Sequence, residues 1–164
     1  MKAWHFVRAD RKLGYSDNRI VKTDRTYKVP TSAPLKLCGY GLHASEKIID
    51  ALKYAPGPVV CRVDLLGKIE SGDDKVVAYV RKVLWMKDIS KELWKFARLC
   101  ALDVIHLWNA PAVVKRFLET GDESIRAAAR AAAGAAAWAA AWAAARDAAG
   151  AAQNKRLIAL IGKE

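Results

Sequence analysis

The chain has 164 residues, 53% of them hydrophobic, and carries 28 Lys and Arg against 17 Asp and Glu, a formal net charge of +11. This length suits one domain, or one domain with a helical appendage. The charge favours acidic partners such as nucleic acid, an acidic protein face or a phosphorylated small molecule, with a merely solubilising surface as the alternative. The excess is largest in residues 1–60, which hold 11 basic and 5 acidic side chains.

The cysteine pattern argues against a disulfide framework and against zinc. Cys38, Cys61 and Cys100 are odd in number and include no Cys-x-x-Cys pair, so we expect reduced, mostly buried thiols in a cytoplasmic protein. The three scattered His residues add no metal spacing, and we predict neither a metal nor a cofactor. The first residues lack an apolar run, so no signal peptide is expected. Charged residues interrupt the Ala-rich tract, so we expect no membrane span.

The N-terminal half is expected to be rich in strands. Alternating side chains predict a strand over residues 2–7, followed by a polar loop over residues 8–18. Residues 19–29 favour a hairpin or one kinked strand. Residues 35–45 then predict a short strand that runs into a Gly-rich turn.

One short helix interrupts this strand-rich part. Ser45 is placed as the N-cap of a helix that continues to about Tyr54. Runs of β-branched residues then predict strong strands over residues 59–66 and 76–85, with a glycine-containing turn region between them.

From Asp88 the apolar residues recur every three or four positions, which predicts helices. A first helix is followed by a second that Asn109 caps and that ends at Gly121. Asp122 or Ser124 caps the Ala-rich segment beyond it.

The fold class predicted by this order is α+β, with helices segregated at the C-terminus. We expect a small, mostly antiparallel sheet with one short helix, followed by a helical part that ends in a long Ala-rich helix. The expected boundaries are a strand-rich basic domain at residues 1–87 and a helical part at residues 88–164, with the Ala-rich helix over residues 122–153.

The Ala-rich tract has a near-repeat of four residues. Within residues 126–150, Arg, Gly or Trp recurs after three residues that are mostly Ala, the strongest helix former. A step of four residues advances about 400° on a helix, so the marked residues form a slowly winding stripe with Trp138 and Trp142 in its middle. These Trp side chains either pack onto the strand domain or belong to a partner-binding face, since Trp and Arg are enriched in interface hot spots.

Basic side chains crowd the beginning of the chain, and three of them recur every three residues. We call the following residues the basic strip: Arg8, Arg11, Lys12, Arg19, Lys22, Arg25 and Lys28. The strip fits phosphate contacts in RNA or DNA. Only Tyr15 and Tyr27 lie within it as stacking aromatics, and the chain has no helix-turn-helix, zinc-finger or RNA-recognition signature.

Two further polar groups are candidate binding residues. His43 and Ser45 lie in the Gly-rich turn, where backbone N–H groups either hold an anion or form a tight structural turn with Ser45 as the cap. Lys75 belongs either to a charged turn or to a polar cluster that lines a cleft with Arg81. No Ser–His–acid triad is indicated, because His43 and Ser45 share one turn and no nucleophile elbow is present.

Several ordered blocks carry a resemblance to a known group of proteins: residues 38–45, residues 50–57, Asp74-Lys75, Arg81 and residues 96–102. Together with the Ala/Trp/Arg-rich tract, they resemble a family of small proteins from tailed phages and prophages over most of the chain. The resemblance implies a phage or mobile-element origin. Small phage accessory proteins of this kind often act on the host, including by blocking CRISPR or other defence complexes. The resemblance therefore implies that the partner is a host protein or a nucleoprotein complex.

A second, partial similarity is to ADP-ribosyltransferase folds. It is carried by a His on the opening strand, a Gly-x-His-x-Ser turn, a helix that ends in Tyr-Ala and a following β-branched strand. The similarity implies that His5 holds the ribose of NAD, that Tyr54 stacks on the nicotinamide and that Glu70 is the catalytic acid, although the context of Glu70 matches no recognisable motif.

Three hypotheses follow from the sequence. The favoured one is a phage-derived accessory protein in the host cytoplasm that binds and inhibits a host complex through a basic surface and a helical face. The alternatives are an NAD-using enzyme and a nucleic-acid-binding protein without a protein target. The first is favoured because the charge, the lack of a catalytic constellation and the phage resemblance agree.

Overall fold

The structure, a computed structural model, describes residues 1–14, 17–108, 110–134 and 150–162. The chain divides into two compact units, Met1–Ser90 and Lys91–Glu164. The first is built on an antiparallel sheet and the second on helices, which confirms the predicted α+β class. No helix in the described ranges is long and apolar enough to cross a membrane.

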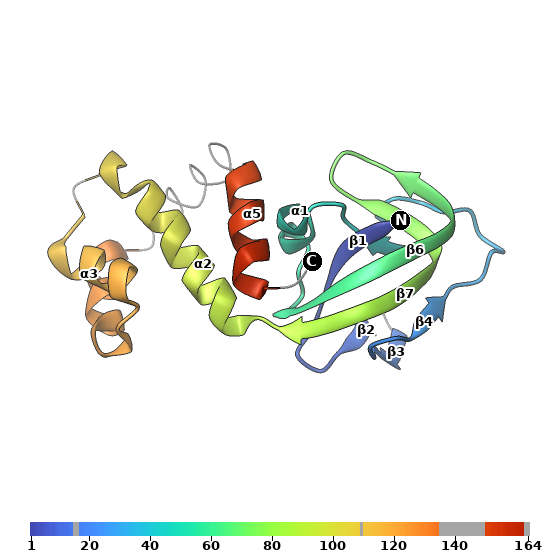
Figure 1. Ribbon diagram of the computed structural model, residues 1–164, viewed down its shortest axis with the longest axis horizontal. Helices are drawn as coiled ribbons and strands as arrows, with labels where there is room; N and C mark the ends of the chain where they lie inside the picture. Colours follow the sequence, from blue (N-terminus) through green and yellow to red (C-terminus); the bar gives the residue numbers. More distant parts are fainter. Residues whose placement is uncertain (15–16, 109, 135–149, 163–164) are drawn as a thin grey trace. The chain divides into compact units, whose positions relative to one another are not determined.

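The first unit is organised around one five-stranded sheet (Figure 1). Its strands are β1 (Lys2–Val7), β4 (Thr26–Lys28), β5 (Leu42–Ala44), β6 (Val59–Ser71) and β7 (Val76–Asp88). The order is β1-β6-β7-β4, with β5 also paired to β7, and every pairing is antiparallel. The 13-residue strands β6 and β7 form a hairpin onto which the other three strands pair.

The β6–β7 hairpin is longer than its sequence suggests. The strand expected over residues 59–66 continues to Ser71, because the register shifts between Leu66 and Ile69 and pairing resumes beyond the shift. Gly67 lies within this irregularity at φ 76°, a conformation that glycine adopts without steric cost. The glycine therefore marks a bulge in a continuing strand and not the expected turn.

The segment before the hairpin differs from its prediction in two places. The expected loop over residues 8–18 contains β2 (Lys12–Gly14) and the beginning of β3 (Asp17–Ile20), which pair as a separate two-stranded sheet. Residues 19–29 form neither a hairpin nor a single strand, because β3 pairs with β2 whereas β4 pairs with β7. Strands of three or four mostly polar residues have little alternation for a sequence pattern to detect.

The Gly-rich turn precedes its strand instead of following it. An isolated bridge between Lys36 and Tyr40 closes the turn, and β5 begins after it at Leu42. Cys38 has φ 59° and Gly41 has φ 124° inside this turn. The prediction of a strand that runs into the turn is therefore wrong.

The capping role predicted for Ser45 is also wrong. Its N–H and C=O are bonded to the backbone of Trp4 at 2.9 and 2.7 Å, and the N-cap of α1 (Ile48–Lys53) is Lys47, which makes no side-chain cap. Pairing with the opening strand outweighs the local capping preference. The helix ends with Tyr54 at the C-cap, close to the expected position.

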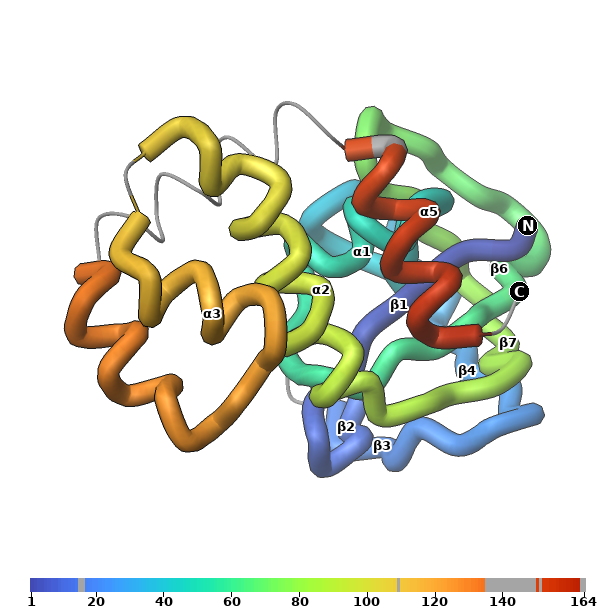
Figure 2. Tube along the Cα trace, turned by 60° about the vertical axis from the view of Figure 1, so that its left-hand side comes forward, coloured from blue at the N-terminus to red at the C-terminus, as the bar shows by residue number. Residues whose placement is uncertain are grey.

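Both sides of β1 are buried. Ala3 and Val7 belong to the main core cluster of the first unit, whereas Trp4 and Phe6 alternate to the other side and are 3% and 2% exposed. Helix α1 packs against β1 (Figures 1 and 2) and buries Ile48. The opening strand is thus held by β6 at its edge and by side chains on both faces.

The second unit is helical and has its own core (Figure 2). Its elements are α2 (Ser90–Asp103), η1 (Ile105–Leu107), α3 (Ala112–Thr120), η2 (Glu123–Ile125), helical residues 126–134 and α5 (Gly150–Ile161). The core cluster consists of Ala101, Val114, Phe117, Leu118 and Ala129. The predicted end of α3 is confirmed, since Gly121 takes φ 69° there, and Asp122 caps the next turn by accepting from the Ser124 N–H.

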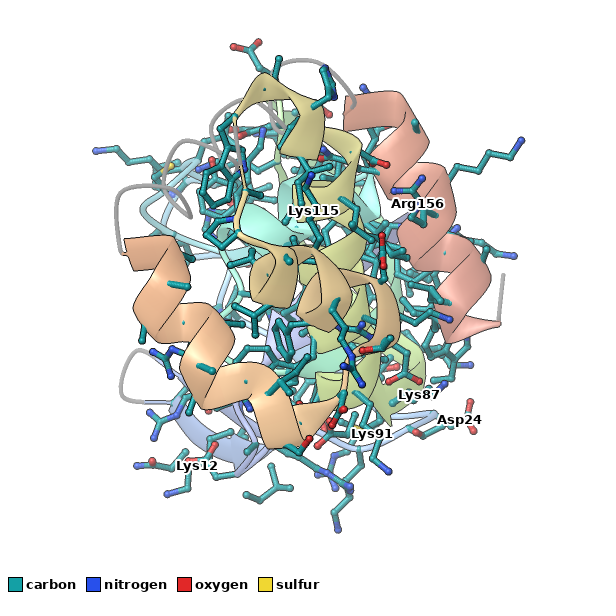
Figure 3. All side chains as sticks on the ribbon, turned by 90° about the vertical axis from the view of Figure 1, so that its left-hand side faces the viewer. Lys12, Asp24, Lys87, Lys91, Lys115 and Arg156 are labelled. Atoms are coloured by element: carbon teal, nitrogen blue, oxygen red, sulfur yellow. The ribbon has the colours of Figure 1, made fainter. Side chains whose placement is uncertain are left out.

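Polar side chains tie the helices of the second unit together. Arg98 Nη1 donates to the Leu118 carbonyl at 3.1 Å, at the C-terminal end of α3 where a cation is favoured. Arg156 of α5, labelled in Figure 3, donates to Asp103 of α2 at 2.6 Å. These bonds join segments that lie far apart in the sequence.

The described part of the Ala-rich tract is helical over residues 126–134 and again from Gly150. Gly134 has φ 60°, and α5 continues past residue 153 to Ile161, where Leu157 and Ile161 are buried. Trp138 and Trp142 lie outside the described residues, as does Asn109, the expected cap of α3.

Replacement of Gly41 by Ala is expected to destabilise the first unit strongly. A Cβ there would lie 2.3 Å from Val77 Cγ2 and 2.9 Å from Leu35 Cδ2, at a φ that L residues rarely adopt. Backbone strain and overpacking together cost about 2–5 kcal/mol of unfolding free energy. Gly67→Ala is the matched control, because its positive φ has open space around it; it should cost about 1 kcal/mol. Equal losses for the two variants in urea denaturation would contradict the packing described for Gly41.

Candidate functional site

The basic strip runs over β2, β3, the connection at residues 21–25 and the edge strand β4. Six of its seven side chains are exposed and Lys12 is half-buried. Figure 3 shows the Lys12 side chain extending away from the ribbon beside β2. The structure therefore places the predicted cations on one stretch of surface in the first unit.

Strand alternation explains why these cations face outward. On β4 the middle residue Tyr27 is 2% exposed, so Lys28 beside it points to the opposite, solvent side. The Tyr27 hydroxyl donates to the Ile20 carbonyl at 2.7 Å and accepts from the Lys22 N–H at 2.8 Å. One buried phenol thus fixes the connection between β3 and β4, a role that the sequence analysis missed and that strand alternation indicates.

Two cations of the strip are already neutralised within the chain. Arg8 pairs with Asp10 at 3.2 Å, and Arg19 pairs with Asp17 at 2.6 Å. The Arg19 guanidinium also donates to the Lys28 carbonyl at 3.1 Å. The hydrogen bond from Arg19 lowers the pKa of the Asp17 carboxyl. Arg19 therefore connects β3 to β4, and its charge is balanced by Asp17 within the chain.

The other five cations of the strip have no carboxylate within 4.0 Å among the described residues: Arg11, Lys12, Lys22, Arg25 and Lys28. Asp10 and Asp17 are each held by an arginine, and the remaining local carboxylate, Asp24, is exposed on the connection (Figure 3). The result is a positively charged surface whose cations are available to an external anion.

A second polar group lies inside the first unit, centred on Arg81. This residue is on β7, opposite Tyr27 of β4 and Leu65 of β6, and it is the largest fully buried side chain. Its Nη1 donates to the His43 carbonyl at 2.6 Å, whereas its Nε has no hydrogen-bond partner. Burial lowers the pKa of Arg81 to about 10, so the guanidinium remains charged at neutral pH.

His5 contributes a second unsatisfied atom to this interior. It lies on β1 opposite Cys61 of β6, and its buried Nε2 has no hydrogen-bond partner. Burial, followed by the charges of Arg81 and His43, lowers the pKa of His5 well below its usual value. Burial also raises the pKa of the Cys61 thiol to about 11. At neutral pH both neighbours are therefore uncharged, and neither compensates the guanidinium.

His43 connects this interior with the Gly-rich turn. It lies on β5, its Nε2 accepts from the Cys38 N–H at 3.1 Å, and burial lowers its pKa. The structure thus joins Arg81 to the backbone of His43, whereas His5 lies on β1 without a hydrogen bond from its Nε2. Ser45 is buried and uses its backbone to bridge to Trp4.

Lys75 lies in a different cluster, at the surface. Its Nζ is 3.8 Å from the centroid of the Tyr54 ring and 3.0 Å from Cys38 Sγ, while the Tyr54 hydroxyl donates to Asp74 at 2.7 Å. Lys53 also approaches Asp74, at 3.7 Å. This surface cluster joins the end of α1 to the β6–β7 turn, and Lys75 is not part of a polar cluster with Arg81.

The three residues suggested by the ADP-ribosyltransferase similarity are not assembled. Tyr54 is bound to Asp74 at the surface, Glu70 pairs with Lys68 at 3.2 Å on β6, and His5 lies in the interior. No hydrogen bond or ion pair in the described ranges joins any two of them. Among all the residues that the structure describes, no group of His, Cys, Asp or Glu side chains has the arrangement of a metal site. All three cysteines are free, with Cys38 exposed and the other two buried.

The fold and these sites define a β-sheet unit with a cationic outer surface, an interior arginine and an appended helical unit. Residues 1–95 match the family described as a domain of unknown function, DUF7666. This match covers more than half of the chain, which therefore belongs to that family. Comparison with curated proteins and with solved structures gives no match. The matched residues include all of the basic strip and the buried polar group, whereas most of the helical unit lies beyond them.

The buried state of His5 predicts a loss of stability in mild acid. Because its pKa is lower in the folded chain, the unfolded chain takes up the proton first as the pH falls through about 6.5. Unfolding is therefore favoured progressively from about pH 6.5 downwards, at roughly 1 kcal/mol per pH unit from this residue. Urea midpoints between pH 7.5 and 5.5 should show a shallower dependence for His5→Asn. His106→Asn, at an exposed position on η1, is the control; an unchanged slope for His5→Asn would contradict the interior placement.

Proposed function

We propose that this chain is a binding protein whose first unit docks on a polyanionic partner through the basic strip. The observation that carries the proposal is the set of five strip cations without a carboxylate partner in the described residues, beside two that are neutralised internally. The strip also lies wholly within the part of the chain that matches the family.

The partner in this proposal is a nucleic-acid-containing complex of the host cell. The five cations without a carboxylate partner lie on β2, β4 and the segments next to these strands, where they can contact phosphates. The resemblance to phage accessory proteins supports a host defence complex, of the CRISPR or another type, as the target. The protein would act in the host cytoplasm by occupying a surface that the complex needs. The helical unit adds contact area through Trp94 and Leu107, which are 61% and 64% exposed.

The decisive test removes charge from the strip while keeping its strands. Lys22→Gln, Arg25→Gln and Lys28→Gln change exposed side chains on the connection and on β4, so folding should be retained. We expect the triple variant to bind single-stranded RNA and duplex DNA at least tenfold more weakly than the wild type in fluorescence anisotropy. The slope of log affinity against log salt should become shallower by about 2–3, because each lost phosphate contact removes counterion release.

The matched control removes three equally exposed positive charges from the second unit, away from Trp94 and Leu107 in the sequence: Lys115→Gln, Arg116→Gln and Lys155→Gln. It has the same net charge as the strip variant. If both variants lose affinity equally, binding depends on overall charge and the strip has no special role. A wild-type protein without salt-dependent nucleic-acid binding would remove the proposal altogether.

A second experiment identifies the partner. Tagged wild type and the strip variant are incubated with lysate of the host, with and without nuclease. A host complex enriched by the wild type alone supports the proposal, and its loss on nuclease treatment assigns the contact to the nucleic acid. Enrichment of naked nucleic acid without any protein would instead favour the nucleic-acid-binding alternative.

A further inference from the structure

We propose that the interior of the first unit is a binding site for a small oxyanion, a phosphate or carboxylate group, held by Arg81 and His5. The inference does not depend on the basic strip acting as a docking surface. It rests on two buried polar atoms, Arg81 Nε and His5 Nε2, that the protein leaves without partners and that lie on the two strands flanking β6.

The guanidinium of Arg81 is the main argument. A buried cation is normally compensated by a carboxylate, because the loss of its hydration is otherwise unbalanced. No carboxylate lies within 4.0 Å of Arg81 among the described residues, and the hydrogen bond to the His43 carbonyl satisfies Nη1 with a neutral group. An oxyanion supplies both the missing charge and an acceptor for Nε–H, and arginine is well matched to its geometry.

His5 of β1 supplies a second donor. In the tautomer that carries its proton on Nε2, the imidazole donates to the same anion without becoming charged. The neighbouring groups include His43 of β5 and Cys61 of β6; burial lowers the pKa of His43 and raises that of Cys61, so neither carries a negative charge at neutral pH. The Asp17 carboxylate, whose charge also reaches Arg81, is already paired with Arg19 at 2.6 Å. The buried cation therefore has neutral polar neighbours, a composition that selects an anion.

The position of the site connects it with the surface. Arg81 lies opposite Tyr27 of β4, and the Arg19 guanidinium lies 5.9 Å from the centroid of the Tyr27 ring, so the interior cation is close to the part of the basic strip on β3 and β4. The field of the strip raises the local concentration of small anions there. Because the strip cations are on the surface and Arg81 is buried, substitutions in the strip and at Arg81 can test docking and anion binding separately.

The first test uses inorganic phosphate as the probe. Thermal unfolding of the full chain is measured with rising sodium phosphate, at an ionic strength held constant with sodium chloride. A site that binds only the folded chain raises the melting temperature along a saturating curve, and sodium acetate tests the carboxylate form of the ligand. No rise beyond that given by chloride for either anion would overturn the proposal.

Variants assign the effect to the interior. Arg81→Met keeps much of the volume without the charge and should abolish the phosphate-dependent rise, and His5→Leu should reduce it at least fivefold in apparent affinity. The strip variant Lys22→Gln, Arg25→Gln and Lys28→Gln should retain it, so the result is independent of the docking function. Loss of the effect in the strip variant with retention in Arg81→Met would overturn the assignment.

A direct measurement covers the case in which Arg81→Met fails to fold. In ¹⁵N-labelled wild type the buried Arg81 Nε–H gives its own resonance, assigned with Arg81→Lys. Titration with phosphate should move this resonance with the same saturation as the melting temperature, and chloride should not. A resonance that stays in place throughout would mean that Nε is satisfied by a water molecule, and would overturn the proposal.

Discussion

The pairing of β6 with β7 is the constraint on which the first unit depends. These two strands share a register that runs from Val59 opposite Asp88 to Ser71 opposite Val76. Strand β1 has its partner on β6, and β4 and β5 have theirs on β7, so each position follows from the hairpin. Antiparallel pairing also alternates side chains between two faces, which decides what each flanking strand buries and exposes.

This alternation separates two kinds of positive charge. On β4 it directs Tyr27 inward and Lys28 outward, so the strip cations remain hydrated. On β7 it directs Arg81 inward, where its charge is shielded from water and acts over a longer range. Surface cations favour fast, salt-sensitive encounters with large anions, whereas a buried cation favours a slow, selective contact with one group. The same sheet thus provides two electrostatic environments a few residues apart.

The strength of the local pattern decided how much of this was predictable from the sequence. Strands β1, β6 and β7, the end of α1 and the αL glycine that ends α3 follow from β-branched runs and from Pro and Gly signals. Strands β4 and β5 depend on pairing with the distant strand β7, and β2 and β3 are too short and polar to show an alternation. Ser45 does not cap α1, because its backbone pairs with Trp4 instead. All strip cations could be found in the sequence, but not which of them are internally paired. The contact of Arg81 with the His43 backbone required the pairing of β5 with β7, which no local pattern contains.

The unequal exposure of the three thiols gives the first unit a built-in attachment point. Cys38 is exposed in the turn before β5, whereas Cys61 and Cys100 are buried. A thiol-reactive dye or spin label added to the folded chain therefore modifies Cys38 first. The label would stand beside Lys75 and Tyr54. One conjugation step, without engineered cysteines and without altering any residue of the basic strip, thus yields a probe for following partner association.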